Sequence, residues 1–125
     1  MSEDGSKQIR SEVTKEGKLL ISIQSTEIPE PKEDEVLIKI EASPINPSDL
    51  GLLIGPADVS SLSVSGEGEN AVVSMDIPEG LLRMLDSRID QSLPVGNEGG
   101  GIIVAAGDQV SKDLIGKTVG VAGGS

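Results

Sequence analysis

The chain has 125 residues, and none of them is cysteine, histidine or an aromatic residue. It carries 10 basic and 21 acidic side chains, and its formal net charge of −11 repels the phosphates of nucleic acids and anionic membrane surfaces. The composition therefore excludes disulfides, a histidine base and aromatic stacking platforms, while the length suffices for one domain with an aliphatic core.

A β-hairpin is the first predicted element. Residues 8–14 and 19–28 alternate polar and apolar side chains, and Glu16-Gly17-Lys18 between them has the composition of a turn. Residues 28–32 are rich in proline, which predicts an extended connector.

A strand and a short helix are predicted next. Residues 36–42 alternate strictly, with Ile40 on the apolar face, which predicts a half-buried antiparallel strand. Asn46 suits the N-cap of a helix, Pro47 suits its first position, and Asp49 can face the unpaired N–H groups. Nearby glycines keep this helix short.

The middle of the chain changes character at Pro78. Residues 57–76 are rich in serine and glycine, which predicts a loop with a short strand at 72–75. From Pro78 to Gln91 an apolar stripe at helical spacing predicts an amphipathic helix. The stripe consists of Leu81, Leu82, Leu85 and Ile89.

The last third of the chain is β again. Residues 101–106 and 118–122 are predicted strands, and a turn is predicted at 107–108. Glycine-rich turns around short strands favour a mainly β fold with short helices, of Greek-key or barrel type, over a parallel α/β sheet.

Residues 44–49 match a motif of a known enzyme family. Zinc-dependent members read Gly-Ile-Cys-x-x-Asp at this point, and Ile45 and Asp49 match this motif. Asn46 stands where those members have a zinc-binding cysteine, and a neutral amide is a poor zinc ligand.

Residues 94–101 match a second motif of the same family, Gly-His-Glu-x-x-Gly. Gly96, Glu98 and Gly101 match, and Asn97 replaces the histidine ligand. The chain thus resembles the catalytic domain of the medium-chain dehydrogenase/reductase superfamily, in its zinc-independent, quinone-oxidoreductase-like branch.

The resemblance implies a GroES-like domain over residues 1–125, a partly open β-barrel that is incomplete at its C-terminal end. A Rossmann cofactor domain is expected after residue 125 and is absent from this chain. The full-length enzyme would transfer hydride from NADPH or NADH to a quinone, enone or activated carbonyl. The fragment alone is predicted to be inactive and to bind neither cofactor nor zinc.

The resemblance also implies site residues. Asn46 would lie against the nicotinamide, with Pro47 and Asn97 on the same side of the cofactor, in a cleft wall centred on Asn46 and residues 96–101. Asn46 and Asp49 are the candidate catalytic residues. Asn46 can instead merely cap the helix, and Asp49 can be an anion of its first turn, and both roles of Asn46 can coexist because capping uses only the amide oxygen.

Two further features concern the middle of the chain. Asn46 and Asn97 are 51 positions apart, more than twice the interval in the family, which predicts an insertion at about 59–92 that contains the amphipathic helix. The helix could be a lid, an interface or an element packed on its own domain.

Residues 66–71 fit the dinucleotide-binding pattern G-x-G-x-x-A, but two glutamates and the missing strand–turn–helix context exclude a cofactor loop.

The expected partners are a small-molecule substrate and a second copy of the chain in a homodimer, with no nucleic acid and no membrane. The acidic N-terminus is unlike a signal peptide, which predicts a cytoplasmic protein. The alternatives are a stand-alone GroES-like binding or co-chaperonin module, and a structural or regulatory fragment that dimerises through unpaired strands.

Overall fold

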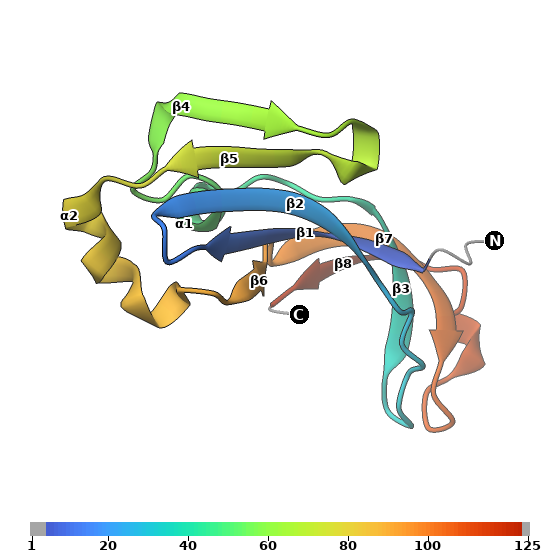
Figure 1. Cartoon of the computed structure of the whole chain (residues 1–125). Helices are drawn as coiled ribbons and strands as arrows, with labels where there is room; N and C mark the ends of the chain where they lie inside the picture. Colours follow the sequence, from blue (N-terminus) through green and yellow to red (C-terminus); the bar gives the residue numbers. More distant parts are fainter. Residues whose placement is uncertain (1–4, 124–125) are drawn as a thin grey trace. The chain divides into compact units, whose positions relative to one another are not determined.

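The computed structural model describes residues 5–123, which form two compact units. The first unit contains residues 5–26 and 46–95, and the second contains residues 27–45 and 96–123. Each unit is built on one antiparallel sheet (Figure 1), which confirms the predicted mainly β fold and is consistent with a GroES-like domain. No helix in the described part is long and apolar enough to cross a membrane.

The first unit contains a five-stranded sheet with the strand order β4-β5-β2-β1-β6. Its strands are β1 (Ser6–Val13), β2 (Lys18–Thr26), β4 (Asp58–Ser65), β5 (Val72–Asp76) and β6 (Ser92–Pro94). β1 and β2 form the predicted hairpin, with Val13 opposite Leu19 next to the turn. Gly17 closes this turn with a φ of 87°, a conformation that glycine adopts without strain.

The prediction of a loop over residues 57–76 was wrong for its first half. Residues 58–65 form β4, an edge strand that pairs with β5 and connects to it through a tight turn. Its residues are exposed except for the half-buried Ser61, and even Leu62 is 47% exposed. Backbone pairing with β5 holds this edge, together with a hydrogen bond from the N–H of Asp76 to the Ser61 hydroxyl at 2.7 Å, so the sequence shows no apolar alternation that would reveal a strand.

The core of the first unit lies on one face of this sheet. Leu19 pairs with Val13 on β1 and with Met75 on β5, so these three side chains lie side by side, and Ile77 completes the buried cluster. Partly buried apolar side chains pack against it, namely Ile21, Ala57, Leu82, Leu85 and Ile89. Val13 and Leu19 are 0% and 1% exposed, so the two side chains next to the hairpin turn are fully buried.

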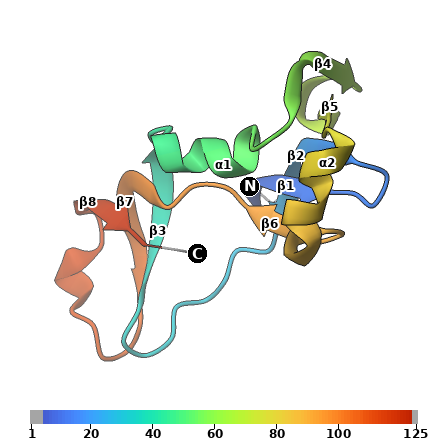
Figure 2. The ribbon, with the colours of Figure 1, turned by 90° about the vertical axis from the view of Figure 1, so that its left-hand side faces the viewer.

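The predicted helix over residues 78–91 is shorter than expected. Residues 79–82 form α2, which lies near the hairpin end of the sheet (Figure 2), and residues 83–88 form a 3₁₀ helix, η4. Leu85 leaves helical geometry with φ −110° and ψ 15°, and Ile89 is extended. This break lets Ile89 form a bridge to Val13, so tertiary packing overrides the helical period. Leu81, which belongs to the predicted stripe, is 38% exposed.

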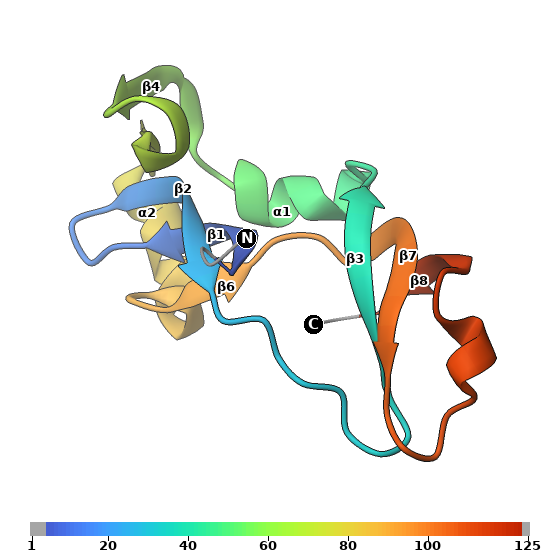
Figure 3. The same cartoon turned by 90° about the vertical axis from the view of Figure 1, so that its right-hand side faces the viewer.

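The second unit contains a three-stranded sheet with the order β3-β7-β8, seen side by side in Figure 3. β3 (Val36–Ala42) and β8 (Thr118–Ala122) have the predicted bounds, whereas β7 (Glu98–Ala106) begins earlier than predicted. The pairing of β3 with β7 has register shifts between Leu37 and Ile38 and between Ile40 and Ala42, and Ile40 is 48% exposed and not buried.

Candidate functional site

The segment that carries Asn46 begins with a capping box. Asn46 is extended, with φ −93° and ψ 156°, and Pro47 opens the short 3₁₀ helix η2 (Pro47–Asp49) that continues into α1 (Leu50–Leu53). The carboxylate of Asp49 accepts a hydrogen bond from the backbone N–H of Asn46 at 2.8 Å, and the Asn46 side chain faces the backbone of Asp49 in return. The predicted helix start is therefore confirmed.

The burial of Asp49 fits this structural role. Its side chain is only 7% exposed, and one carboxylate oxygen is held by the backbone at the start of the turn. An anion at this position offsets the unpaired N–H groups of the first turn. The structure thus gives Asp49 the role of a first-turn anion, and its catalytic role stays a prediction.

The other end of the same segment is tied to β1 by two polar side chains that the sequence analysis missed. The hydroxyl of Ser11 donates a hydrogen bond to the carbonyl of Leu52 at 2.6 Å. Arg88 donates from Nη2 to the Ser11 hydroxyl at 3.2 Å and from Nη1 to the carbonyl of Gly51 at 3.4 Å. Burial of the Arg88 guanidinium lowers its pKa from the ordinary value.

One signal in the sequence points to Ser11. It occupies the inward position of an alternating strand, between Ile9 and Val13, and its side chain is 0% exposed. A polar residue at a buried strand position requires a hydrogen-bond partner. Nothing in the sequence identifies Leu52 or Arg88 as that partner, because both lie more than 40 positions away.

Asn97 belongs to the second unit, in the loop before β7. Its side chain is exposed, and its backbone carbonyl accepts a hydrogen bond from the N–H of Gly123 at 2.9 Å. Gly96 precedes it with a φ of 102°, which explains the glycine there. Asn46, Pro47 and Asp49 are thus neighbours in the first unit, and the cofactor role of Asn97 stays a prediction.

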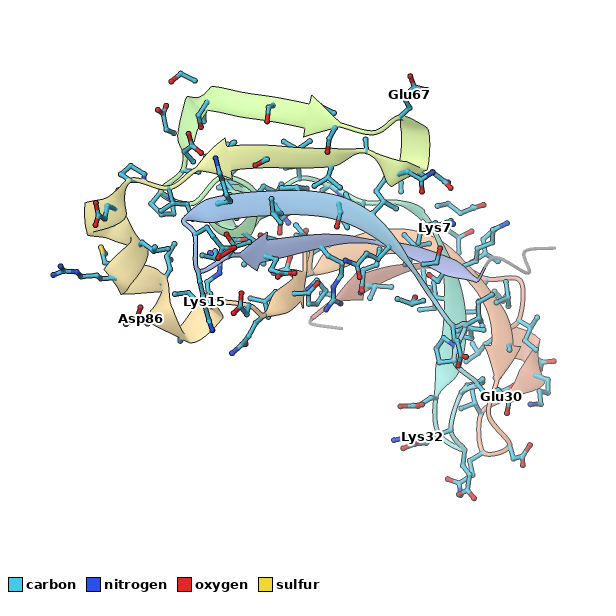
Figure 4. All side chains as sticks on the ribbon, in the orientation of Figure 1. Lys7, Lys15, Glu30, Lys32, Glu67 and Asp86 are labelled. Atoms are coloured by element: carbon cyan, nitrogen blue, oxygen red, sulfur yellow. The ribbon has the colours of Figure 1, made fainter. Side chains whose placement is uncertain are left out.

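The glycine pattern at residues 66–71 forms the turn between β4 and β5. A Cβ atom at Gly66 would lie 2.6 Å from the carbonyl oxygen of Asn70, so this glycine serves a tight turn. The turn continues into strand β5 and not into a helix, as the sequence analysis expected. Figure 4 shows the side chain of Glu67 pointing away from the sheet, and Glu69 pairs with Lys7 at 3.5 Å. This acidic turn does not suit a pyrophosphate.

The chain can supply few of the side-chain types that bind zinc in proteins. Zinc in proteins is bound by thiolates, imidazoles and carboxylates, usually four at a time. The sequence supplies carboxylates only, and no group of three of them within residues 5–123 could hold a metal ion.

Comparison with known proteins identifies a partial homologue. No protein-family model matches the chain. A stretch of 36 residues is 64% identical to part of a zinc-type alcohol dehydrogenase-like protein of Schizosaccharomyces pombe. The match covers 29% of this chain and 11% of that protein, so only a small part of the relative's length is represented. This partial homology agrees with the medium-chain dehydrogenase/reductase resemblance of the two loops.

Proposed function

We propose that this chain is the N-terminal, GroES-like part of a nicotinamide-dependent oxidoreductase that acts on a quinone, an enone or another activated carbonyl compound. The observation that carries the proposal is the homology to an alcohol dehydrogenase-like protein. The mainly β architecture supports it, because the catalytic domain of the medium-chain dehydrogenase/reductase superfamily has such a fold. Since the match covers only 11% of the relative, we propose the activity for the product of the complete reading frame that contains this sequence.

Within this proposal the chain orients the reactants. The nicotinamide supplies the hydride when the cofactor is bound. Asn46 offers a primary amide, which has one acceptor oxygen and two donor hydrogens, so capping and a contact to the nicotinamide carboxamide or a substrate oxygen are compatible. The capping box with Asp49 fixes the backbone from which this amide projects. Pro47 stiffens the same turn by fixing its own φ.

We further propose that the enzyme is zinc-independent, although the relative is named a zinc-type protein. Asparagine stands at residues 46 and 97, where the zinc-dependent motifs have cysteine and histidine. Neutral amides are poor zinc ligands, and the chain has no cysteine or histidine to replace them.

The decisive experiment uses the product of the complete reading frame that contains this sequence. We expect it to consume NADPH or NADH when a quinone or an enone is added, and we expect a glycine-rich Rossmann segment after residue 125. The 125-residue chain alone should show no NADPH binding by calorimetry, because a Rossmann domain supplies the glycine loop that holds the pyrophosphate. A ring-shaped heptamer without oxidoreductase activity would instead establish the co-chaperonin alternative.

A further inference from the structure

We propose that Arg88 and Ser11 are positioning residues that fix the Asn46 segment, residues 46–53, on the sheet of the first unit. The inference rests on the proposed function in one respect, namely that Asn46 meets the nicotinamide. The polar contacts themselves are independent of that function, because they join three parts of the same unit.

The Asn46 segment is held at both of its ends. At its start, the capping box between Asn46 and Asp49 closes the first turn. At its end, the carbonyls of Gly51 and Leu52 accept hydrogen bonds from Arg88 and Ser11. Carbonyl groups in the last turn of a helix have no partner within the helix, so these two side chains satisfy groups that otherwise need water.

Apolar packing alone does not fix the position of this segment. None of the four residues of α1 is fully buried: Leu52 and Leu53 are half-buried, and Leu50 is 45% exposed. Apolar contacts are also non-directional, whereas a hydrogen bond selects one partner atom and one geometry. The bonds from Ser11 and Arg88 therefore determine which part of α1 lies over β1.

The two polar side chains are removed from water to different degrees, since Arg88 as a residue is half-buried. Ser11 is fully buried, and the Nε atom of Arg88 is buried without a hydrogen-bond partner among the described residues. Within residues 5–123 no carboxylate lies at ion-pair distance from Arg88, so carbonyl and hydroxyl oxygens are its acceptors. A buried polar atom without a partner, such as this Nε, costs free energy, so the contact adds less stability than its number of hydrogen bonds suggests. What the polar pair adds is a defined position for α1.

Arg88 also gives the predicted insertion a role. It lies within residues 59–92, in η4, which packs on the core through Leu85. The 3₁₀ helix η4 is thus anchored by its apolar residues, and its Arg88 reaches the end of α1. In this arrangement the insertion supports the Asn46 segment through the hydrogen bonds of Arg88 to Gly51 of α1 and to Ser11 of β1.

Amide hydrogen exchange in the isotopically labelled 125-residue chain tests the inference. The N–H groups of Ile54 and Gly55 both donate to the carbonyl of Leu50, so their exchange reports on α1. In Arg88→Met we expect exchange at Ile54 and Gly55 to accelerate about tenfold, since hydrogen bonds from a charged group are lost. Arg83→Met is the matched control, because Arg83 lies on the same 3₁₀ helix and is exposed. We expect this substitution to leave the exchange of Ile54 and Gly55 unchanged.

Two further variants keep the test decisive if Arg88→Met opens the whole unit. Ser11→Ala removes a single hydroxyl and should accelerate the same two amides, and Arg88→Lys should restore part of their protection. The NMR signals of the Asn46 side-chain amide should shift in Arg88→Met and Ser11→Ala but not in Arg83→Met. Unchanged exchange and unchanged Asn46 signals in both Arg88→Met and Ser11→Ala would overturn the positioning role.

The catalytic consequence is measured separately in the complete enzyme. There Arg88→Met should lower kcat more than it raises KM for the cofactor, because the Rossmann domain holds the pyrophosphate and so most of the cofactor, while Asn46 loses its position against the nicotinamide. If the complete protein has no nicotinamide-dependent activity, the proposed function fails, whereas the exchange result still decides whether Arg88 and Ser11 position the segment.

Discussion

Met84 and Leu85 are neighbours in the chain, but one side chain lies in solvent and the other packs against the core. Leu85 packs against the core of the first unit, whereas the side chain of Met84 is 78% exposed. Leu85 belongs to the apolar stripe that the sequence analysis considered as a dimer interface, and its packing shows that the stripe is largely occupied within its own unit.

The different exposure of Leu85 and Met84 predicts different effects of their substitution on the free energy of unfolding. Leu85→Asp places a charge against the core and should lower the free energy of unfolding by about 2–4 kcal/mol. Met84→Asp changes an exposed side chain and should leave stability within about 0.5 kcal/mol. Urea titration followed by far-ultraviolet circular dichroism measures both, since the chain has no aromatic fluorophore. Equal effects of the two substitutions would contradict the packing of Leu85.

The homodimer stays a prediction, and the edge strands of the two sheets are its expected interface. β4 and β6 end one sheet, and β3 and β8 end the other, within the part of the chain that the structure describes. An edge strand can pair with a second copy through its backbone. Sedimentation of Met84→Asp should therefore still show a dimer, and a monomer at high concentration of the unaltered chain would rule the dimer out.

The two roles of Asn46 can be separated by substitution. Asn46→Ala removes the cap and should cost about 1 kcal/mol of unfolding free energy, whereas Asn46→Ser retains a capping oxygen and should cost little. Both lack the amide, so both should reduce hydride transfer in the complete enzyme if the amide meets the nicotinamide. Full activity of Asn46→Ser would assign Asn46 to capping alone.

Local chemistry explains which elements could be predicted from the sequence. The hairpin and the bounds of β3 and β8 follow from alternation and glycine turns, which act over a few residues. The helix start at Asn46 follows from the preferences of asparagine, proline and aspartate for successive positions. These signals depend on neighbours in sequence alone.

The features that were missed depend on distant partners. β4 is held by pairing with β5 and has an exposed, serine-rich sequence, so no apolar pattern marks it. The helix after Pro78 is cut short because Ile89 is extended and bridges to Val13. The contacts of Arg88 join residues that the sequence places far apart, and a spacing rule cannot identify them.

The second unit offers a test of close backbone approach. A Cβ atom at Gly101 would overlap the carbonyl oxygen of Lys39 on the neighbouring strand, whereas at Gly100 its nearest contact would be an ordinary 3.7 Å from the carbonyl oxygen of Val119. Gly101→Ala should therefore lower the free energy of unfolding by about 1–3 kcal/mol, as overpacking does. Gly100→Ala is the matched control and should change it far less. If thermal unfolding gives the same midpoint for both variants, β3 and β7 do not approach as closely as described.

Zinc content tests the proposed branch of the family. A zinc site requires several thiolate, imidazole or carboxylate ligands that converge on one point. The chain has no cysteine or histidine, and within residues 5–123 no three acidic side chains form a group that could hold a metal. We therefore expect elemental analysis of the dialysed complete protein to find well under one equivalent of zinc, and chelator treatment to leave its activity unchanged. Stoichiometric zinc that resists the chelator would refute the zinc-independent assignment and would require ligands from outside this sequence.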